Sequence, residues 1–300
     1  MEPTSFELSE QQRAAVHTDD PFVMVSAGPG CGKTTALAHR VHHLLEAAPS
    51  SSEDREHHEF GNKVLALSYS RAAAAELNAR LGHSNGATSD VWSSTIHAFA
   101  RALLHETDYD QRSLDVVLTP LAKHDLWLEA MGAVEMPGEE FFGKLDGWAK
   151  FCAELVEHIQ STNLAMASPE AFQDNLTNPD APLVVWFLDV WSAYETLKLE
   201  RGACDFGDLV VLAARALAED ESVKHWVRTH IRHVLVDELQ DTNPTQQAVL
   251  EHLAQIVGNF WGVGDERQAI YRFQGARPDV IERIASRFDS TRLGLTLNRR

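Results

Sequence analysis

The stretch with the clearest chemistry is AGPGCGKTT at positions 27–35, which lies between an apolar run and a helical pattern. Glycines in such a loop let backbone N–H groups face phosphates, and the helix that follows adds its positive N-terminal end. Lys33 can reach the β- and γ-phosphates, and the Thr34 hydroxyl suits Mg²⁺. The sequence therefore predicts a P-loop for a nucleoside triphosphate, formed by Ala27, Gly28, Gly30, Cys31, Gly32, Lys33, Thr34 and Thr35.

A second candidate is HVLVDELQDTN at positions 233–243, where an apolar run ends in two consecutive carboxylates. At the end of a buried strand, Asp237 suits a Mg²⁺ ligand and Glu238 suits a base that activates water. Alone, an acidic pair after a strand is more often a solvated turn. Together with the P-loop, it indicates a nucleoside triphosphatase.

The elements that must position these groups follow an α/β order. Apolar runs at 21–27, 62–69, 233–237, 260–265 and 292–298 predict buried strands, and 34–48 and 71–81 predict helices. Between residues 105 and 200 the pattern changes to helical spacing at 121–132, 141–160 and 183–200, without strands between. We therefore expect a parallel-sheet α/β fold interrupted by an all-helical insertion.

Composition limits the functional class. The chain has 300 residues, of which 44% are hydrophobic and 23% charged, as in soluble globular proteins. We expect a cytoplasmic protein that does not enter a membrane, because there is no long apolar run and no signal-peptide pattern. The three cysteines are far apart, which favours reduced thiols over a disulfide framework.

The net charge of −18 argues against nonspecific adhesion to nucleic acid, because phosphate contacts need Lys and Arg. The charge is concentrated in the middle: residues 105–200 contain 18 acidic and 5 basic side chains. This segment is therefore unsuited to a duplex-binding arm. Solvated faces are the simpler interpretation of its charge, and a surface for a protein partner is the alternative.

The remaining motifs resemble one family. DELQD resembles the second motif of superfamily 1 helicases of the UvrD, Rep and PcrA type, and GVGDERQAIYRFQGA resembles their GDxxQSIYxFRGA motif. LSEQQRAAV, LSYSRAAAAEL, STIHAFARALL and CDFGDLV are similar to four further segments of the family, in family order. The matches lie on both sides of the expected insertion and extend over about two hundred residues. The chain is thus similar to the N-terminal half of these helicases.

The resemblance implies a RecA-like P-loop domain made of residues 1–104 and 201–300, with residues 105–200 as a helical insertion subdomain. It implies ATP hydrolysis with Mg²⁺, coupled to 3′–5′ translocation on single-stranded DNA, or at a junction with duplex, and to strand separation. The second RecA-like domain of the family is absent from this chain, so we expect poor activity from the chain alone. GLTLNRR at 294–300 resembles the start of the family's fourth motif, which makes the C-terminus read as an interruption.

The resemblance also assigns residues. Gln12 falls where the family reads adenine, although Ser9 and Gln12 also match a helix capping box. Gln268 falls on the γ-phosphate sensor, Arg300 on a residue that stabilises γ-phosphate charge, and Arg299 beside the adenine. The DNA-facing positions, where aromatic rings stack on bases, are Tyr69, Thr95, His97, Tyr271 and Phe273.

The chain departs from the family pattern where Thr35 replaces an Arg and Arg299 replaces a Tyr. Gln274 also replaces an Arg, and Arg71 and Ala72 replace an Asn-Lys pair. In the family, the Arg that Thr35 replaces and the Tyr that Arg299 replaces enclose the adenine. The usual sandwich therefore cannot form in this chain. Two other functions remain open. The chain could be the motor part of a helicase–nuclease, or a non-motor DNA-binding or regulatory module that keeps the fold.

Overall fold

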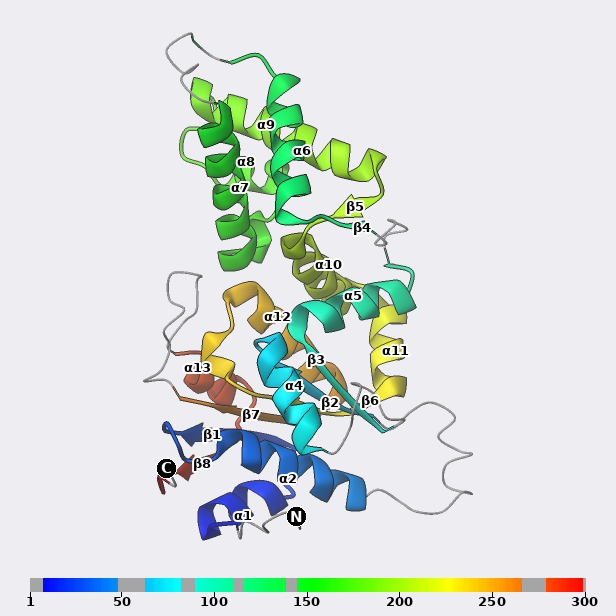
Figure 1. Cartoon of the computed structure of the whole chain (residues 1–300), viewed down its shortest axis with the longest axis vertical. Helices are drawn as coiled ribbons and strands as arrows, with labels where there is room; N and C mark the ends of the chain where they lie inside the picture. Colours follow the sequence, from blue (N-terminus) through cyan, green and yellow to red (C-terminus); the bar gives the residue numbers. More distant parts are fainter. Residues whose placement is uncertain are drawn as a thin grey trace.

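A computed structural model of the chain describes residues 8–47, 63–81, 90–109, 116–136, 138, 145–265 and 279–298. Its centre is a six-stranded sheet in which every pair of neighbours is parallel. The strand order is β3-β2-β6-β7-β1-β8 (Figure 1). The strands are β1 (Phe22–Ala27), β2 (Lys63–Ser68), β3 (Val91–Thr95), β6 (Ile231–Val236), β7 (Phe260–Gly264) and β8 (Thr291–Leu295).

Helices cover both faces of the sheet, because successive side chains of each buried strand point to opposite faces. Val23 and Val25 pack on one side, and Met24 between them packs on the other. The first face is covered by α1 (Glu10–His17), α2 (Lys33–Glu46) and α4 (Arg71–Arg80). The second is covered by α5 (Ile96–Glu106), α10 (Phe206–Glu219), α11 (Glu221–His230), α12 (Pro244–Val257) and α13 (Val280–Arg287).

Local sequence determines where these helices start and stop. The Asn243 side chain accepts from the backbone N–H of Gln246 at the start of α12, Pro244 occupies the first turn, and Gly258 ends the helix with φ 74°. Asp205 and Asp208 form a reciprocal capping box at the start of α10. These caps fix the first turns of the helices that follow the functional motifs.

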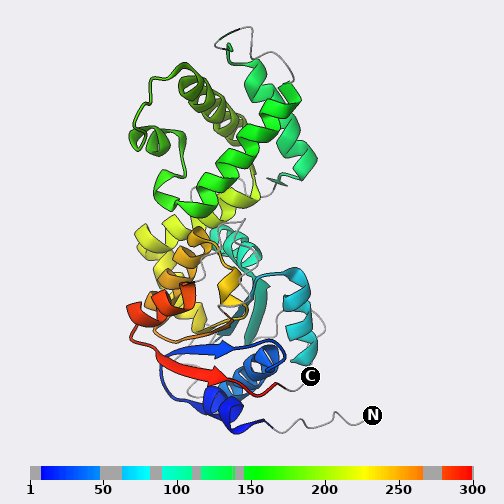
Figure 2. The same ribbon diagram turned by 90° about the vertical axis from the view of Figure 1, so that its left-hand side faces the viewer.

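The helices α6 to α9 lie together at one end of the molecule, away from the sheet (Figure 2). They build an apolar core of their own. The Trp127 and Tyr194 rings stack with centroids 4.1 Å apart, and both side chains are fully buried. Trp186 belongs to the same core and is 3% exposed. The helices are α6 (Pro120–Gly132), α7 (Leu145–Thr162), α8 (Pro169–Asp174) and α9 (Pro182–Glu200), with short η3 (Leu164–Met166) after α7.

The expected strands and helices are present, with two differences. The prediction of no strand between residues 105 and 200 was wrong at β4 (Val116–Val117), which pairs in parallel with β5 (Ala203–Cys204) where the chain enters and leaves the helical part. A two-residue bridge is too short to leave a pattern. Strand β3 was not predicted, because Val91–Thr95 reads VWSST and ends in small polar residues.

The three cysteines are free, as predicted, and all three are buried. Within the ranges described, no helix is long and apolar enough to cross a membrane.

Candidate functional site

The P-loop joins β1 to α2 and depends on two glycines in the left-handed region. Gly30 has φ 76°, and Gly32, at the N-cap of α2, has φ 77°. A Cβ on Gly32 would lie 2.6 Å from Gln12 Nε2, and one on Gly30 would lie 2.6 Å from Asn298 Oδ1. The loop is therefore enclosed between α1 and the segment that follows β8, and only glycine fits both positions.

We expect Gly32→Ala to lower the free energy of unfolding by about 1–3 kcal/mol, because a side chain at this φ is strained and also meets Gln12. Gly147→Ala in α7 is the matched control. It has open space around its Cβ and should stabilise the helix by about 0.5–1 kcal/mol. Urea unfolding measures the change in the free energy of unfolding for both variants. An unchanged free energy of unfolding in Gly32→Ala would contradict the strain argument.

Two pairs of side chains connect the start of α2 to the end of β6. Lys33 Nζ lies 3.0 Å from Glu238 Oε2, and the Lys33 side chain is only 9% exposed. Thr34 Oγ1 donates to Asp237 Oδ2 at 3.3 Å. Parallel strands present their carboxyl ends at one edge of the sheet, which is why groups more than 200 residues apart in sequence meet here.

Glu238 adopts a left-handed conformation, with φ 50° and ψ 46°, that non-glycine residues rarely occupy. Gln240, in η4 (Leu239–Asp241), donates to Glu238 Oε2 at 2.8 Å and accepts from the Asp265 backbone N–H at 2.9 Å. Gln240 thus ties the carboxylate of Glu238 to the end of β7. The sequence reasoning did not single out Gln240, although it lies within the DELQD motif.

Three carboxylates lie at this edge, and Lys33 compensates their negative charge only in part. Burial, followed by the charge of Glu238, raises the pKa of Asp237 to about 6. The same two causes raise the pKa of Asp241 to about 6. A hydroxyl and a buried carboxylate in contact are the hard oxygen donors that Mg²⁺ prefers, and a cation beside Asp237 would favour its ionised form. Thr34 and Asp237 therefore fit a Mg²⁺ site.

Gln12 is 2% exposed and forms a capping box with Ser9, which was the structural alternative to its predicted contact with adenine. The Gln12 Nε2 group also donates to the Cys31 backbone carbonyl at 3.1 Å, so this side chain connects α1 to the P-loop. Thr35, the departure from the family pattern, accepts a hydrogen bond from Arg80 Nη1 at 2.7 Å.

The DNA-facing candidates that the structure describes, Tyr69, Thr95 and His97, line one open cavity of about 560 Å³. Arg71 and Arg101 also line it. His97 is largely buried, and burial lowers its pKa below the ordinary value. The cavity therefore combines aromatic rings with two cationic side chains.

Phe206 also lines this cavity and was missed by the sequence reasoning. It is 46% exposed, and its ring centroid lies 6.0 Å from that of His97 in an edge-to-face arrangement. A second cavity of about 290 Å³ shares both rings as part of its wall. The available signal was the aromatic residue in CDFGDLV, directly after the capping Asp205.

Gln268, Tyr271, Phe273, Arg299 and Arg300, the other residues assigned by resemblance, lie outside the described residues.

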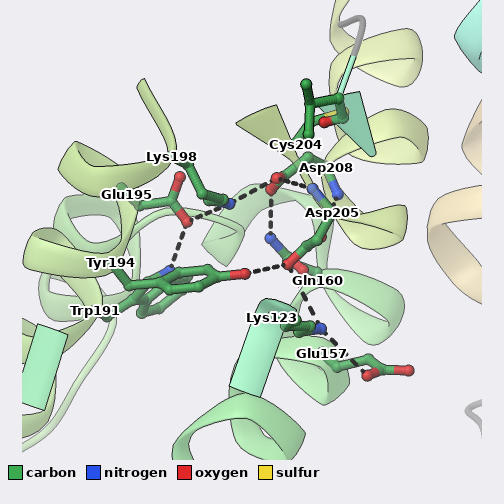
Figure 3. Close-up of polar contacts among 11 residues, drawn as sticks. Lys123, Glu157, Gln160, Trp191, Tyr194, Glu195, Lys198, Cys204, Asp205 and Asp208 are labelled. Carbon is green, nitrogen blue, oxygen red and sulfur yellow. Dashed lines mark hydrogen bonds and ion pairs between the residues drawn. The ribbon is translucent and has the colours of Figure 1, made fainter. Parts of the chain in front are cut away.

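A buried polar network joins the helical part to the first turn of α10 (Figure 3). Lys198 Nζ lies 2.6 Å from Asp208 Oδ2 and 3.0 Å from Glu195 Oε1. Tyr194 Oη donates to Asp205 Oδ2 at 3.0 Å. Gln160 Nε2 of α7 donates to Asp208 Oδ1 at 3.2 Å, and Lys123 Nζ of α6 lies 3.5 Å from Asp205 Oδ2.

Nearly the whole chain matches one known family. The sequence profile of the UvrD/REP helicase N-terminal domain matches residues 8–289. The chain belongs to this UvrD/REP helicase family. Its six-stranded parallel sheet and P-loop agree with the RecA-like fold expected of such a domain.

Named relatives of this UvrD/REP helicase domain are helicases. The ATP-dependent DNA helicase PcrA of Staphylococcus epidermidis is 24% identical over 273 residues, covering 90% of this chain and 34% of the relative. DNA helicase II of Salmonella typhimurium is 27% identical over 284 residues, covering 94% and 36%. PcrA of Bacillus subtilis is 27% identical over 270 residues, covering 90% and 34%. The chain thus spans about a third of the length of these relatives.

Proposed function

We propose that this UvrD/REP domain is the ATP-binding part of a DNA helicase, with residues 1–104 and 201–300 as a motor domain and 105–200 as a helical subdomain. The observation that carries the proposal is the meeting of Lys33, Thr34, Asp237 and Glu238 at one edge of the sheet. The family resemblance implies a second motor domain, which would complete the ATP site and the DNA-binding surface.

In this proposal, each group has one task in ATP hydrolysis. Lys33 would contact the β- and γ-phosphates. Thr34 and Asp237 would hold Mg²⁺, which would supply positive charge against the phosphate oxygens. Glu238 accepts a proton from the attacking water, and Gln240 keeps its carboxylate oriented. Gln268 and Arg300 would act at the γ-phosphate and Gln12 and Arg299 at the adenine, as the resemblance implies.

The DNA site of the proposal is the cavity lined by Tyr69, Thr95 and His97, extended by Phe206. Aromatic rings can stack on unpaired bases irrespective of sequence, which suits a motor that moves along a single strand. Arg71 and Arg101 supply local positive charge in an otherwise acidic chain. We propose from the resemblance that the movement is 3′–5′. We also propose that the protein is cytoplasmic. The acidic insertion is the proposed surface for a protein partner.

Calorimetric titration with ATP and Mg²⁺ tests the nucleotide site on this chain. Hydrolysis with and without single-stranded DNA, by a version continued beyond Arg300 through the second motor domain, tests the coupling. We expect ATP binding that is lost in Lys33→Ala and hydrolysis that rises when DNA is added. Lys63→Ala, at the far end of β2, is the matched control and should bind ATP normally. ATP binding that does not need Lys33 would contradict the proposed site, and hydrolysis indifferent to DNA would favour a module without motor function.

Phe206→Ala should weaken the binding of single-stranded DNA by about 1–3 kcal/mol, or roughly five- to 150-fold in Kd, because a stacking platform is removed. Phe151→Ala is the control, since Phe151 is 51% exposed on α7 and remote from the cavity. Fluorescence anisotropy with a labelled oligonucleotide measures both Kd values. Equal affinity in Phe206→Ala and the unchanged chain would remove Phe206 from the DNA site.

A further inference from the structure

The segment that leaves β8 runs beside the P-loop. Strands β1 and β8 are parallel neighbours, and their register pairs Ala27, the last residue of β1, with Leu295, the last residue of β8. The P-loop follows the first strand, and the exit segment (residues 296–298) follows the second at the same edge of the sheet. All three residues of the exit segment are exposed, so burial does little to fix its position.

A side chain of α1 holds the exit segment. Gln11 accepts from the Thr296 backbone N–H at 2.9 Å through Oε1 and donates to Thr296 Oγ1 at 3.0 Å through Nε2. Two hydrogen bonds to one planar amide define both the distance and the orientation of Thr296. Because the neighbouring Gln12 binds the Cys31 carbonyl, consecutive residues of α1 contact the exit segment and the P-loop.

Two residues beyond Thr296, the exit segment reaches the P-loop. A Cβ on Gly30 would lie 2.6 Å from Asn298 Oδ1 and 3.2 Å from Asn298 Cγ. The Asn298 amide therefore occupies the space that a side chain at Gly30 would need. Gly30 has φ 76°, and glycines in such loops let backbone N–H groups face phosphates. Contact with Asn298 limits the conformations that this flexible residue can adopt.

We propose that Gln11 is a positioning residue for the P-loop. It fixes Thr296, which places Asn298 against Gly30 and keeps the loop in the conformation that receives phosphates. This inference rests on the proposed nucleotide site. A loop that is ordered before its ligand arrives binds more tightly, since binding then costs less conformational entropy. The effect concerns the phosphates and is independent of the base, because Gly30 belongs to the phosphate-binding loop.

Calorimetric titration of this chain with Mg²⁺ and either ATP or inorganic tripolyphosphate tests the proposal. Tripolyphosphate has the phosphates without the base. Gln11→Ala and Asn298→Ala should each raise the Kd of both ligands by about three- to tenfold. The double variant should bind within about twofold of the weaker single variant, because Gln11 acts through Asn298. Thr296→Ser keeps both hydrogen-bonding groups and should match the unchanged chain.

The matched control is Gln173→Ala, which truncates an exposed glutamine on α8 in the helical part. This variant should bind both ligands as the unchanged chain does. Circular dichroism establishes that each variant is folded, so that a change in Kd reports the binding site and not a loss of structure.

Each other outcome overturns something definite. Unchanged Kd values in Gln11→Ala, with binding still lost in Lys33→Ala, would refute the role of Gln11 alone. Additive losses in the double variant would show that Gln11 does not act through Asn298. A loss of affinity for ATP without one for tripolyphosphate would place the effect at the base and overturn the proposal. Binding of both ligands by Lys33→Ala would refute the nucleotide site and this inference together.

Discussion

Glu238→Gln is expected to reduce ATP hydrolysis by about 10²–10⁴-fold and to tighten ATP binding at the same time. The first effect follows because an amide cannot accept the proton of the attacking water, and a positioned general base typically contributes this factor. Single-turnover hydrolysis at saturating ATP and single-stranded DNA measures it. Glu282→Gln on α13 is the control. It alters an exposed ion pair with Arg292 of β8, and this variant should hydrolyse ATP normally.

The tighter binding follows from the ion pair between Lys33 and Glu238, whose atoms are 3.0 Å apart. ATP phosphates must compete with this carboxylate for the buried ammonium. The neutral amide of the Glu238→Gln variant would weaken the competition, so we expect the Kd for ATP to fall by about three- to tenfold, which corresponds to roughly 1 kcal/mol. This part needs no turnover. Weaker ATP binding in Glu238→Gln would show that Glu238 does not compete for Lys33.

Lys198→Met should lower the free energy of unfolding by about 3–5 kcal/mol, because it leaves buried carboxylates without their cation. The methionine side chain has nearly the same length as that of lysine. The loss of stability therefore reflects the missing charge more than a change of shape. Lys150→Met removes an equivalent ion pair with Glu154 at a side chain that is 73% exposed, and should change stability by less than about 0.5 kcal/mol. Urea unfolding of both variants gives the comparison, and similar small losses would contradict the assigned importance of the network.

The deficit of Lys198→Met should also grow as pH rises. Burial, followed by the charge of Asp205, raises the pKa of Asp208 to about 6 even with Lys198 present. A carboxyl group with a raised pKa in the folded state favours folding below its unfolded value and disfavours it as pH rises through the folded value. Without Lys198 this pKa rises further, so the variant should be closer to the unchanged chain at about pH 5 than at about pH 8. A constant difference at both pH values would contradict this.

Much of the α/β fold was predictable because its signals are local. Buried parallel strands are continuous apolar runs, and the P-loop needs glycines at set positions, as Gly30 and Gly32 show. The Asp237–Glu238 pair follows its strand directly, so the topology placed it near Lys33 once the sheet was assumed. The roles of these residues in hydrolysis stay predictions.

Other features depended on contacts that no single stretch encodes. Lys198 and Asp208 are ten residues apart, but their contact requires α9 and α10 to pack at one junction. Arg80 reaches Thr35 only because α4 and α2 lie on the same face of the sheet. Phe206 was overlooked because its exposure depends on the turn that Asp205 caps.

The order of strands in the sheet has a consequence for how the protein is made. On a ribosome, β1 emerges first, yet its only neighbours in the described sheet are β7 and β8, whose registers pair Val23 with Trp261 and Thr291. Likewise, β6 can pair with β2 only after the whole helical part has been synthesised, and β7 must then pair with both β6 and β1. Such distant pairings form slowly and leave strand edges open meanwhile. The N-terminal strands should therefore stay unpaired until the C-terminal strands are made, while the core of α6–α9, which draws only on residues 118–203, can form before them.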